Sequence, residues 1–276
     1  MRVILSTGLT PPLTPWTWVP ATLALLIYAW AALGIDQRSA RWSLAAAWVA
    51  QGTSLLAHVL GVGEVEPGAR FGFAPALCAT AWLVVAVYGI ENRFVPLITV
   101  RRVLAVLGGL STALMLMFPG EPHLHPGAPW APLHWLLGIA SYGLFGAAVL
   151  HASLLDRAER AMRMKRTTTT PPAVPGIPLL KLEALTFRFV SSGFLVLTAA
   201  IVMGGLFAGP WRWDHKTVFS LLGWLVFAAL LLGRRTFGWR GRQAIRWLYA
   251  GSVLLLLAYV GSRFVFEVLL QRSPGP

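Results

Sequence analysis

The chain has 276 residues, of which 57% are hydrophobic and only 12% are charged. A water-soluble domain carries about 25% charged residues, so this composition excludes that class and predicts an integral membrane protein. The formal net charge of +13 on so apolar a chain indicates basic cytoplasmic loops and no nucleic-acid partner. Because Cys78 is the single cysteine, disulfide frameworks, thiolate zinc sites and C-x-x-C-H haem attachment are also excluded.

Apolar runs long enough to cross about 30 Å of hydrocarbon as helices recur along the whole chain. We expect an all-α polytopic bundle with eight transmembrane helices, forming a single membrane domain over residues 1–276 in the lipid bilayer. The first run follows Arg2 and several prolines, so it is interpreted as a retained helix and not as a signal peptide. In chain order the predicted helices cover residues 16–35, 43–61, 71–90, 97–118, 131–155, 185–209, 218–233 and 245–270.

The Lys and Arg residues between these helices predict the orientation. Most of the 23 lie in the first, third, fifth and seventh connections, and basic loops remain on the cytoplasmic side. We therefore expect a multi-pass protein of the cytoplasmic (inner) membrane with both termini on the outer, periplasmic side. Residues 156–184 are basic and contain four threonines followed by two prolines, so they are predicted to be a cytoplasmic linker.

The histidines indicate where a ligand is expected, because five of the six lie toward the predicted outer face. His134 opens the fifth predicted helix, and small residues on its face leave room for a flat ring. His215 lies in the third outward loop. His151 lies about 25 Å deeper than His134 on the same helix, so these two cannot share one ligand. The residues on the face of His134 are Gly138, Ser141, Tyr142 and Phe145.

The third outward loop, residues 209–216, combines two indoles, an imidazole and charges of both signs. Iron in six-coordinate haem takes an imidazole nitrogen on each face of the ring, and His134 and His215 lie at matching predicted depths. A haem site is therefore one interpretation, in which Asp214 orients an imidazole. The other candidates are Trp211 and Trp213 as covers of the ring, and Arg212, Lys216 and Arg263 as partners of the propionates.

A narrow polar stripe on the second predicted helix is formed by Gln51, Ser54 and His58, and we expect it to face a cavity or the bundle interior. His58 is a further candidate haem ligand. The stripe also permits a transporter or channel in which these side chains and Arg263 line a path. The absence of internal repeats and the outer position of the histidines argue against that alternative. A b-type cytochrome needs histidine pairs on neighbouring helices, and only the fifth predicted helix has two.

The C-terminal half resembles the cytochrome c assembly protein family, related to CcsA and CcmC, and is most similar to its HemX-like and YpjD-like branch of haem-handling membrane proteins. The resemblance covers residues 130–272, whereas the first four predicted helices agree in hydropathy alone. It is carried by the motif Trp-Arg-Trp-Asp-His-Lys-Thr at 211–217, by Trp224, by Gly-Trp-Arg-Gly-Arg at 238–242, and by Tyr-Val-Gly-Ser-Arg-Phe-Val-Phe-Glu at 259–267.

This resemblance implies a haem b-binding protein that handles or delivers haem at the outer membrane face during cytochrome c assembly. Apocytochrome c or another maturation subunit is the implied partner, and a HemX-like regulator of haem biosynthesis is an alternative. His134 matches the external histidine of the family, and residues 211–214 resemble a shortened W-x-W-D loop. Haem exporters of the family carry a second external histidine, which His215 has to replace here.

Sequence motifs of hydrolases and nucleotide-binding enzymes were not found in the chain. It contains no Ser/His/Asp set, P-loop or dinucleotide fingerprint. We therefore expect the protein not to be an enzyme by itself.

Overall fold

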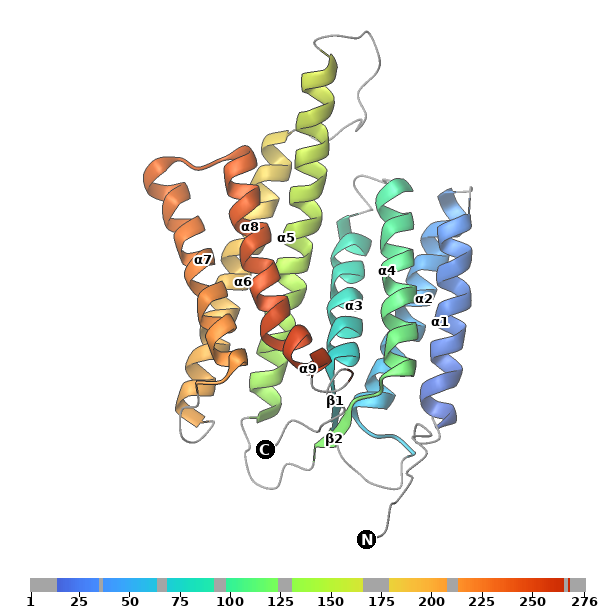
Figure 1. Cartoon of the computed structure of the whole chain (residues 1–276). Coiled ribbons are helices and arrows are strands. Elements are labelled where there is room, and N and C mark those ends of the chain that lie inside the picture. The colour runs from blue at the N-terminus through green and yellow to red at the C-terminus, as the bar shows by residue number, and fades with distance from the viewer. Residues whose placement is uncertain are drawn as a thin grey trace. The chain divides into compact units, whose positions relative to one another are not determined.

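A computed structural model describes residues 14–34, 37–63, 69–91, 98–123, 131–165, 179–207, 213–265 and 268. These residues are almost entirely helical (Figure 1), which confirms the all-α class. A π-helical segment, η1 (Leu257–Gly261), and a short helix, α9 (Ser262–Phe264), continue the last long helix. The long helices are α1 (Pro15–Leu33), α2 (Gln37–Val59), α3 (Phe73–Glu91), α4 (Ile98–Met117), α5 (Ala131–Lys165), α6 (Leu179–Phe207), α7 (His215–Phe237) and α8 (Gly241–Leu256).

Seven helices within the described residues are long and apolar enough to cross a membrane. The chain therefore has the architecture of a multi-pass membrane protein. The long helix outside this group is α2, which begins with Gln37 and Arg38 and carries further polar residues along its length. An eighth span over α2 stays a prediction, as does the outward position of both termini.

The chain divides into two compact units, which are described separately. Unit 1 comprises residues 1–78 and 98–125, and unit 2 comprises residues 79–97 and 126–276. The division passes through α3, whose first turns belong to unit 1 and whose remainder belongs to unit 2. A single membrane domain over residues 1–276 stays a prediction.

Unit 1 is built on α1, which packs against α2 and α4. Alanines at positions 21, 24 and 31 of α1 are fully buried, and such small side chains allow helices to approach closely. On α4, a Cβ at Gly108 would lie 2.6 Å from the ring of Tyr28, so glycine is required there. Two short strands, β1 (Ala69–Phe71) and β2 (Glu121–His123), pair antiparallel with Ala69 opposite His123.

In unit 2, α5 packs along α6 and also contacts α8, which lies against α7. Phe145 of α5 stacks on Phe227 of α7 with ring centroids 3.9 Å apart. Glycine at position 251 of α8 makes room for this contact, because a Cβ there would lie 2.8 Å from the Phe227 ring. The face of α5 that begins with His134 is therefore filled by aromatic packing at the depth of Phe145.

The boundaries of α5 and α6 differ from those predicted by hydropathy. Helix α5 continues to Lys165 and α6 begins at Leu179, so helix extends into both ends of the predicted linker, residues 156–184. Hydropathy marks where apolar residues end, whereas backbone hydrogen bonds continue through polar residues, supported here by the i,i+4 pair of Asp156 and Arg160. The remaining connection, residues 166–178, lies outside the described residues.

Candidate functional site

His134 lies in the first turn of α5 and faces α6. Its Nδ1 lies 3.0 Å from the carbonyl oxygen of Ala200. One turn further along α6, a Cβ at Gly204 would lie 3.1 Å from Cε1 of the imidazole. The missing side chain at Gly204 therefore allows the half-buried ring of His134 to pack directly against the α6 backbone.

The Ala200 bond also determines the tautomer of His134. A carbonyl oxygen only accepts hydrogen bonds, so Nδ1 carries the proton and donates it. In the neutral ring, Nε2 then holds the lone pair and can bind a metal. Within the described residues Nε2 makes no hydrogen bond. An imidazole held through one nitrogen with the other available is the usual arrangement of a histidine ligand.

Open space lies beside the same face of α5. A Cβ at Gly138 would meet no atom within 4 Å in the described part of the chain. One turn deeper, Ser141 is buried and donates to the Gly138 carbonyl at 2.7 Å. The open side of Gly138 therefore lies one turn from His134, whereas the same face is packed at the depth of Phe145.

The segment that leads into α7 places Asp214 at the N-cap of that helix. Its carboxylate accepts a hydrogen bond of 2.7 Å from the Thr217 backbone N–H, which is a stabilising cap. His215 is therefore the first residue of α7 and not part of a loop, and its side chain is exposed, as is Trp213 at 73%. Trp211 and Arg212 lie outside the described residues.

The pKa of the Asp214 carboxyl reflects this position. Partial burial raises the pKa, but the hydrogen bonds from Thr217 and the charges of Lys216 and His215 outweigh burial and leave it below its usual value. The structure thus gives Asp214 a capping role, and orientation of an imidazole by Asp214 stays a prediction.

Two cations meet at one aromatic ring in this part of unit 2. Lys216 Nζ lies 5.5 Å and Arg263 Cζ lies 6.0 Å from the centroid of the Tyr259 ring, distances at which a cation interacts with an aromatic face. Lys216 is also close enough to His134 and to Arg263 for their charges to interact. The three helices α5, α7 and α9 therefore bring an imidazole and two cations into one neighbourhood.

Tyr259 belongs to η1, and π-helical turns within helices often occur at functional sites. Next to η1, the Tyr142 hydroxyl of α5 donates to the carbonyl of Leu255. Tyr259 and the α6 residues Ala200 and Gly204 were not singled out by sequence reasoning. Only Tyr259 had a sequence signal, as the first residue of the family-like motif at 259–267.

The two predicted haem ligands are His134 and His215. Within the described residues, no hydrogen bond or ring contact joins His134 to His215. Lys216, the next residue after His215, does lie near His134. Joint ligation of one iron by both histidines therefore stays a prediction.

The polar stripe of α2 is buried inside unit 1, where each side chain has a protein partner. Gln51 accepts a 2.5 Å hydrogen bond from the Tyr28 hydroxyl, and Ser54 donates to the Thr17 carbonyl at 2.8 Å. The Nε2 of His58 donates to the Pro119 carbonyl at 2.6 Å. These contacts hold unit 1 together, so they do not favour a permeation path. Arg263, the fourth residue of that path, belongs to unit 2.

His151 has a local partner deep in unit 2. Its Nδ1 lies 2.7 Å from the Ala147 carbonyl one turn earlier in α5, and its ring lies 5.1 Å from that of Phe189. These contacts account for a histidine that is 3% exposed.

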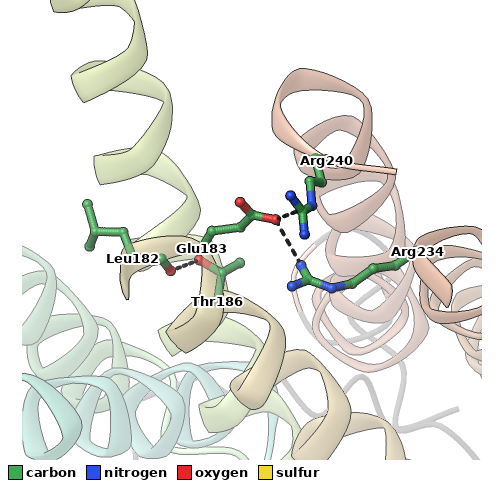
Figure 2. A network of polar contacts seen from close by, with 5 residues as sticks. All are labelled: Leu182, Glu183, Thr186, Arg234 and Arg240. Carbon is green, nitrogen blue, oxygen red and sulfur yellow. Dashed lines mark hydrogen bonds and ion pairs between the residues drawn. The ribbon is translucent and has the colours of Figure 1, made fainter. Parts of the chain in front are cut away.

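The opposite end of unit 2 contains a network of ionic contacts (Figure 2). One carboxylate oxygen of Glu183 on α6 lies 3.2 Å from Nη1 of Arg234 and 3.4 Å from Nε of Arg240. Arg240 belongs to the turn between α7 and α8, which opens with Gly238 in the left-handed conformation at φ 65°. The family-like motif at 238–242 is therefore a tight basic turn, fixed to α6 by Glu183.

Comparison with known proteins gives the following relationships. The family model described as "Cytochrome C assembly protein" matches residues 13–270, including the first four helices. CcsA from Synechococcus sp. (strain CC9902) is 28% identical over 223 residues, 67% of this chain and 71% of that protein. The structure of the cytochrome c haem lyase CcmF matches with a TM-score of 0.57 and 18% identity over 93% of this chain and 48% of that chain, which shows a shared fold.

Two further relatives match shorter parts. An uncharacterised 28.8 kDa protein of Azospirillum brasilense is 32% identical over 156 residues, 54% of this chain and 57% of that protein. CcsA from Picosynechococcus sp. is 36% identical over 105 residues, 36% of this chain and 31% of that protein. The matched segments thus span 57% and 31% of the lengths of these two relatives.

Proposed function

The chain belongs to the cytochrome c assembly protein family, and we propose that it binds haem b and handles or delivers it at the outer face of the cytoplasmic membrane. Membership supports a role in cytochrome c biogenesis. The observation that carries the proposal is the imidazole of His134, which is fixed through Nδ1 to Ala200 and presents Nε2 as a ligand atom.

The charges near His134 suit the rest of a haem molecule. Lys216 and Arg263 meet at the Tyr259 ring, and such cations form charge-assisted hydrogen bonds with carboxylates like the haem propionates. In this proposal His215 supplies the second axial ligand, and the exposed indole of Trp213, together with Trp211, covers the ring. Bound haem supplies the iron-porphyrin group that cytochrome c assembly attaches to its substrate protein.

The distribution of basic residues in unit 2 supports the proposed orientation. The end with the α7–α8 turn carries most of the arginines, and the end with His134 carries few. Since basic segments remain cytoplasmic, we place His134 on the periplasmic side, with eight spans including α2 and both termini outward. The arginines at the basic end are Arg157, Arg160, Arg188, Arg234, Arg235, Arg240, Arg242 and Arg246.

We further propose that attachment of haem is completed with a partner subunit and not by this chain alone. Apocytochrome c or another maturation subunit is the proposed partner at the periplasmic end of unit 2.

Haem titration of the purified full-length protein tests the ligand assignment. We expect a low-spin b-type absorbance spectrum in the wild type, and a fall in haem affinity of at least about tenfold in both His134→Ala and His215→Ala. His151→Ala is the matched control, because this histidine bonds within its own helix, and it should bind haem normally. Unchanged haem binding in both His134→Ala and His215→Ala would reject the proposed site.

Cellular measurements separate delivery from regulation. In cells with His134→Ala, delivery predicts less haem covalently bound to c-type cytochromes at an unchanged total haem content. A HemX-like regulator of haem biosynthesis instead predicts a changed total haem content with cytochromes altered only in proportion.

A further inference from the structure

A pocket lies between α5 and α8, at the end of unit 2 that carries the α7–α8 turn. The two helices pack against each other in unit 2 (Figure 1). The pocket has a volume of about 260 Å³. It is lined by Asp156 and Arg160 of α5 and by Arg242, Ile245, Arg246 and Tyr249 of α8.

The charges of this pocket are unbalanced. Three of its six residues are arginines and one is an aspartate, so the formal charge is positive even though Arg160 pairs with Asp156. Arg242 and Arg246 are one helical turn apart and exposed. Within the described residues, neither of these two side chains has a hydrogen bond or an ion pair. The pocket therefore offers an anion two guanidinium groups that have no ion-pair partner among the described residues.

The beginning of α8 lies next to the pocket. The helix starts at Gly241, and Arg240 at its N-cap makes no side-chain capping bond. Backbone N–H groups in the first turn of a helix point away from it and favour anions. The Glu159 carboxylate of α5 lies at this helix end, 3.4 Å from where a Cβ at Gly241 would be. The preference of the pocket for an anion therefore rests on the guanidinium groups and not on the helix end.

The surroundings of the pocket are apolar on one side. Residues Gly241–Phe264 form one of the segments that are long and apolar enough to cross a membrane, and Ile245 in the pocket wall is 6% exposed. Trp247 and Tyr249 occur at this border, where aromatic side chains mark membrane–water interfaces. A ligand that fits has an anionic head and apolar chains.

We propose that this pocket binds the phosphodiester headgroup of an anionic phospholipid such as phosphatidylglycerol. Arg242 and Arg246 donate to the phosphate oxygens, Arg160 contributes from α5, and the acyl chains lie along the apolar part of α8. Basic pockets between transmembrane helices on the cytoplasmic side bind anionic headgroups in this way. With the orientation proposed above, the lipid belongs to the cytoplasmic leaflet. The lipid site is separate from the proposed haem site and does not depend on haem binding.

Lipid binding to the full-length protein in a nonionic detergent tests this proposal. Native mass spectrometry with added phosphatidylglycerol should show bound lipid, and phosphatidylcholine should bind more weakly because its choline is repelled by the arginines. The double variant Arg242→Gln and Arg246→Gln should lower the affinity for phosphatidylglycerol about thirtyfold. Asp156→Asn should raise it, since it removes the negative charge of the pocket.

The matched control is the double variant Arg188→Gln and Arg235→Gln. It removes two exposed arginines from α6 and α7 of the same unit, neither of which lines the pocket, and should leave phosphatidylglycerol binding unchanged. Equal losses in both double variants would show a nonspecific charge effect and overturn the proposal. Equal binding of phosphatidylcholine would overturn it as well.

Inorganic phosphate is the competitor that distinguishes a lipid from a free anion. Millimolar phosphate should leave the lipid bound, because it lacks the acyl chains. Displacement of phosphatidylglycerol by phosphate alone would identify a free-phosphate site instead. Haem titration of the same variants separates the two proposals, because loss of the lipid site predicts normal haem binding.

Discussion

His58 in unit 1 and His134 in unit 2 are both hydrogen-bonded to a backbone carbonyl, but through different ring nitrogens. His58 uses Nε2 to reach Pro119 and is 2% exposed. His134 uses Nδ1 to reach Ala200 and is half-buried beside the open space at Gly138. His151 is also bonded through Nδ1 but is 3% exposed, so the bonded nitrogen alone does not identify a candidate ligand. His134 combines a bonded Nδ1 with a half-buried ring and open space nearby.

The comparison predicts opposite consequences for the two histidines. His58→Ala leaves the Pro119 carbonyl without its donor, which costs about 1–3 kcal/mol of unfolding free energy, while haem affinity stays normal. His134→Ala should show the reverse, with haem binding lost and a smaller loss of stability in the haem-free protein, because the Ala200 carbonyl lies inside α6 and still accepts the intrahelical hydrogen bond. Thermal unfolding and haem titration of both purified variants check this contrast. An equal fall in haem affinity in His58→Ala and His134→Ala would contradict the predicted contrast.

A smaller effect is expected from the glycine that holds His134 in place. Gly204→Ala puts a Cβ 3.1 Å from Cε1 of the imidazole, so the ring has to shift by a few tenths of an ångström. Because the His134 ring is then no longer held in its original orientation, haem binding should weaken about tenfold. Gly89→Ala is the control, because its Cβ meets no atom within 4 Å in the described residues. Normal haem affinity in Gly204→Ala would mean that the α6 backbone does not position the ligand.

The smallest effect concerns the cap of α7. Asp214→Ala removes the acceptor of the Thr217 N–H and should cost about 1 kcal/mol, seen as faster hydrogen exchange in the first turn of α7. Because the pKa of Asp214 is lowered in the folded protein, its contribution is present above the unfolded-state pKa and lost as the pH falls through the folded-state pKa. The exchange difference from wild type should thus be constant between neutral pH and pH about 5 and vanish in stronger acid. If the exchange difference persists in stronger acid, it does not come from the Asp214 carboxylate.

Much of the helical arrangement was predictable from apolar run length alone. The seven membrane-length helices and the tight turn at 238–242 follow from composition, because every backbone polar group has to be satisfied inside lipid. The extension of α5 to Lys165 and the start of α7 at His215 were not predicted. Hydropathy carries no information on backbone hydrogen bonds that continue through polar residues. The capping role of Asp214 depends on the conformation of the local backbone.

The candidate site was predictable in part. His134, Lys216 and Arg263 were identified by residue type and by their position near predicted outer helix ends. Tyr259 was not given a role, although its ring is where the two cations meet. Its position depends on the π-helical turn and on packing between helices, neither of which has a periodic signal in the sequence.

The amino-acid sequence by itself determined that this protein is helical, apolar along most of its length, and basic at alternating connections, since these properties depend on residue type and spacing. The tertiary structure decided which ring nitrogen of His58 and of His134 is hydrogen-bonded. That depends on which backbone carbonyl lies within 3 Å of the ring, and carbonyls from segments more than 60 residues away reach a histidine only when helices pack.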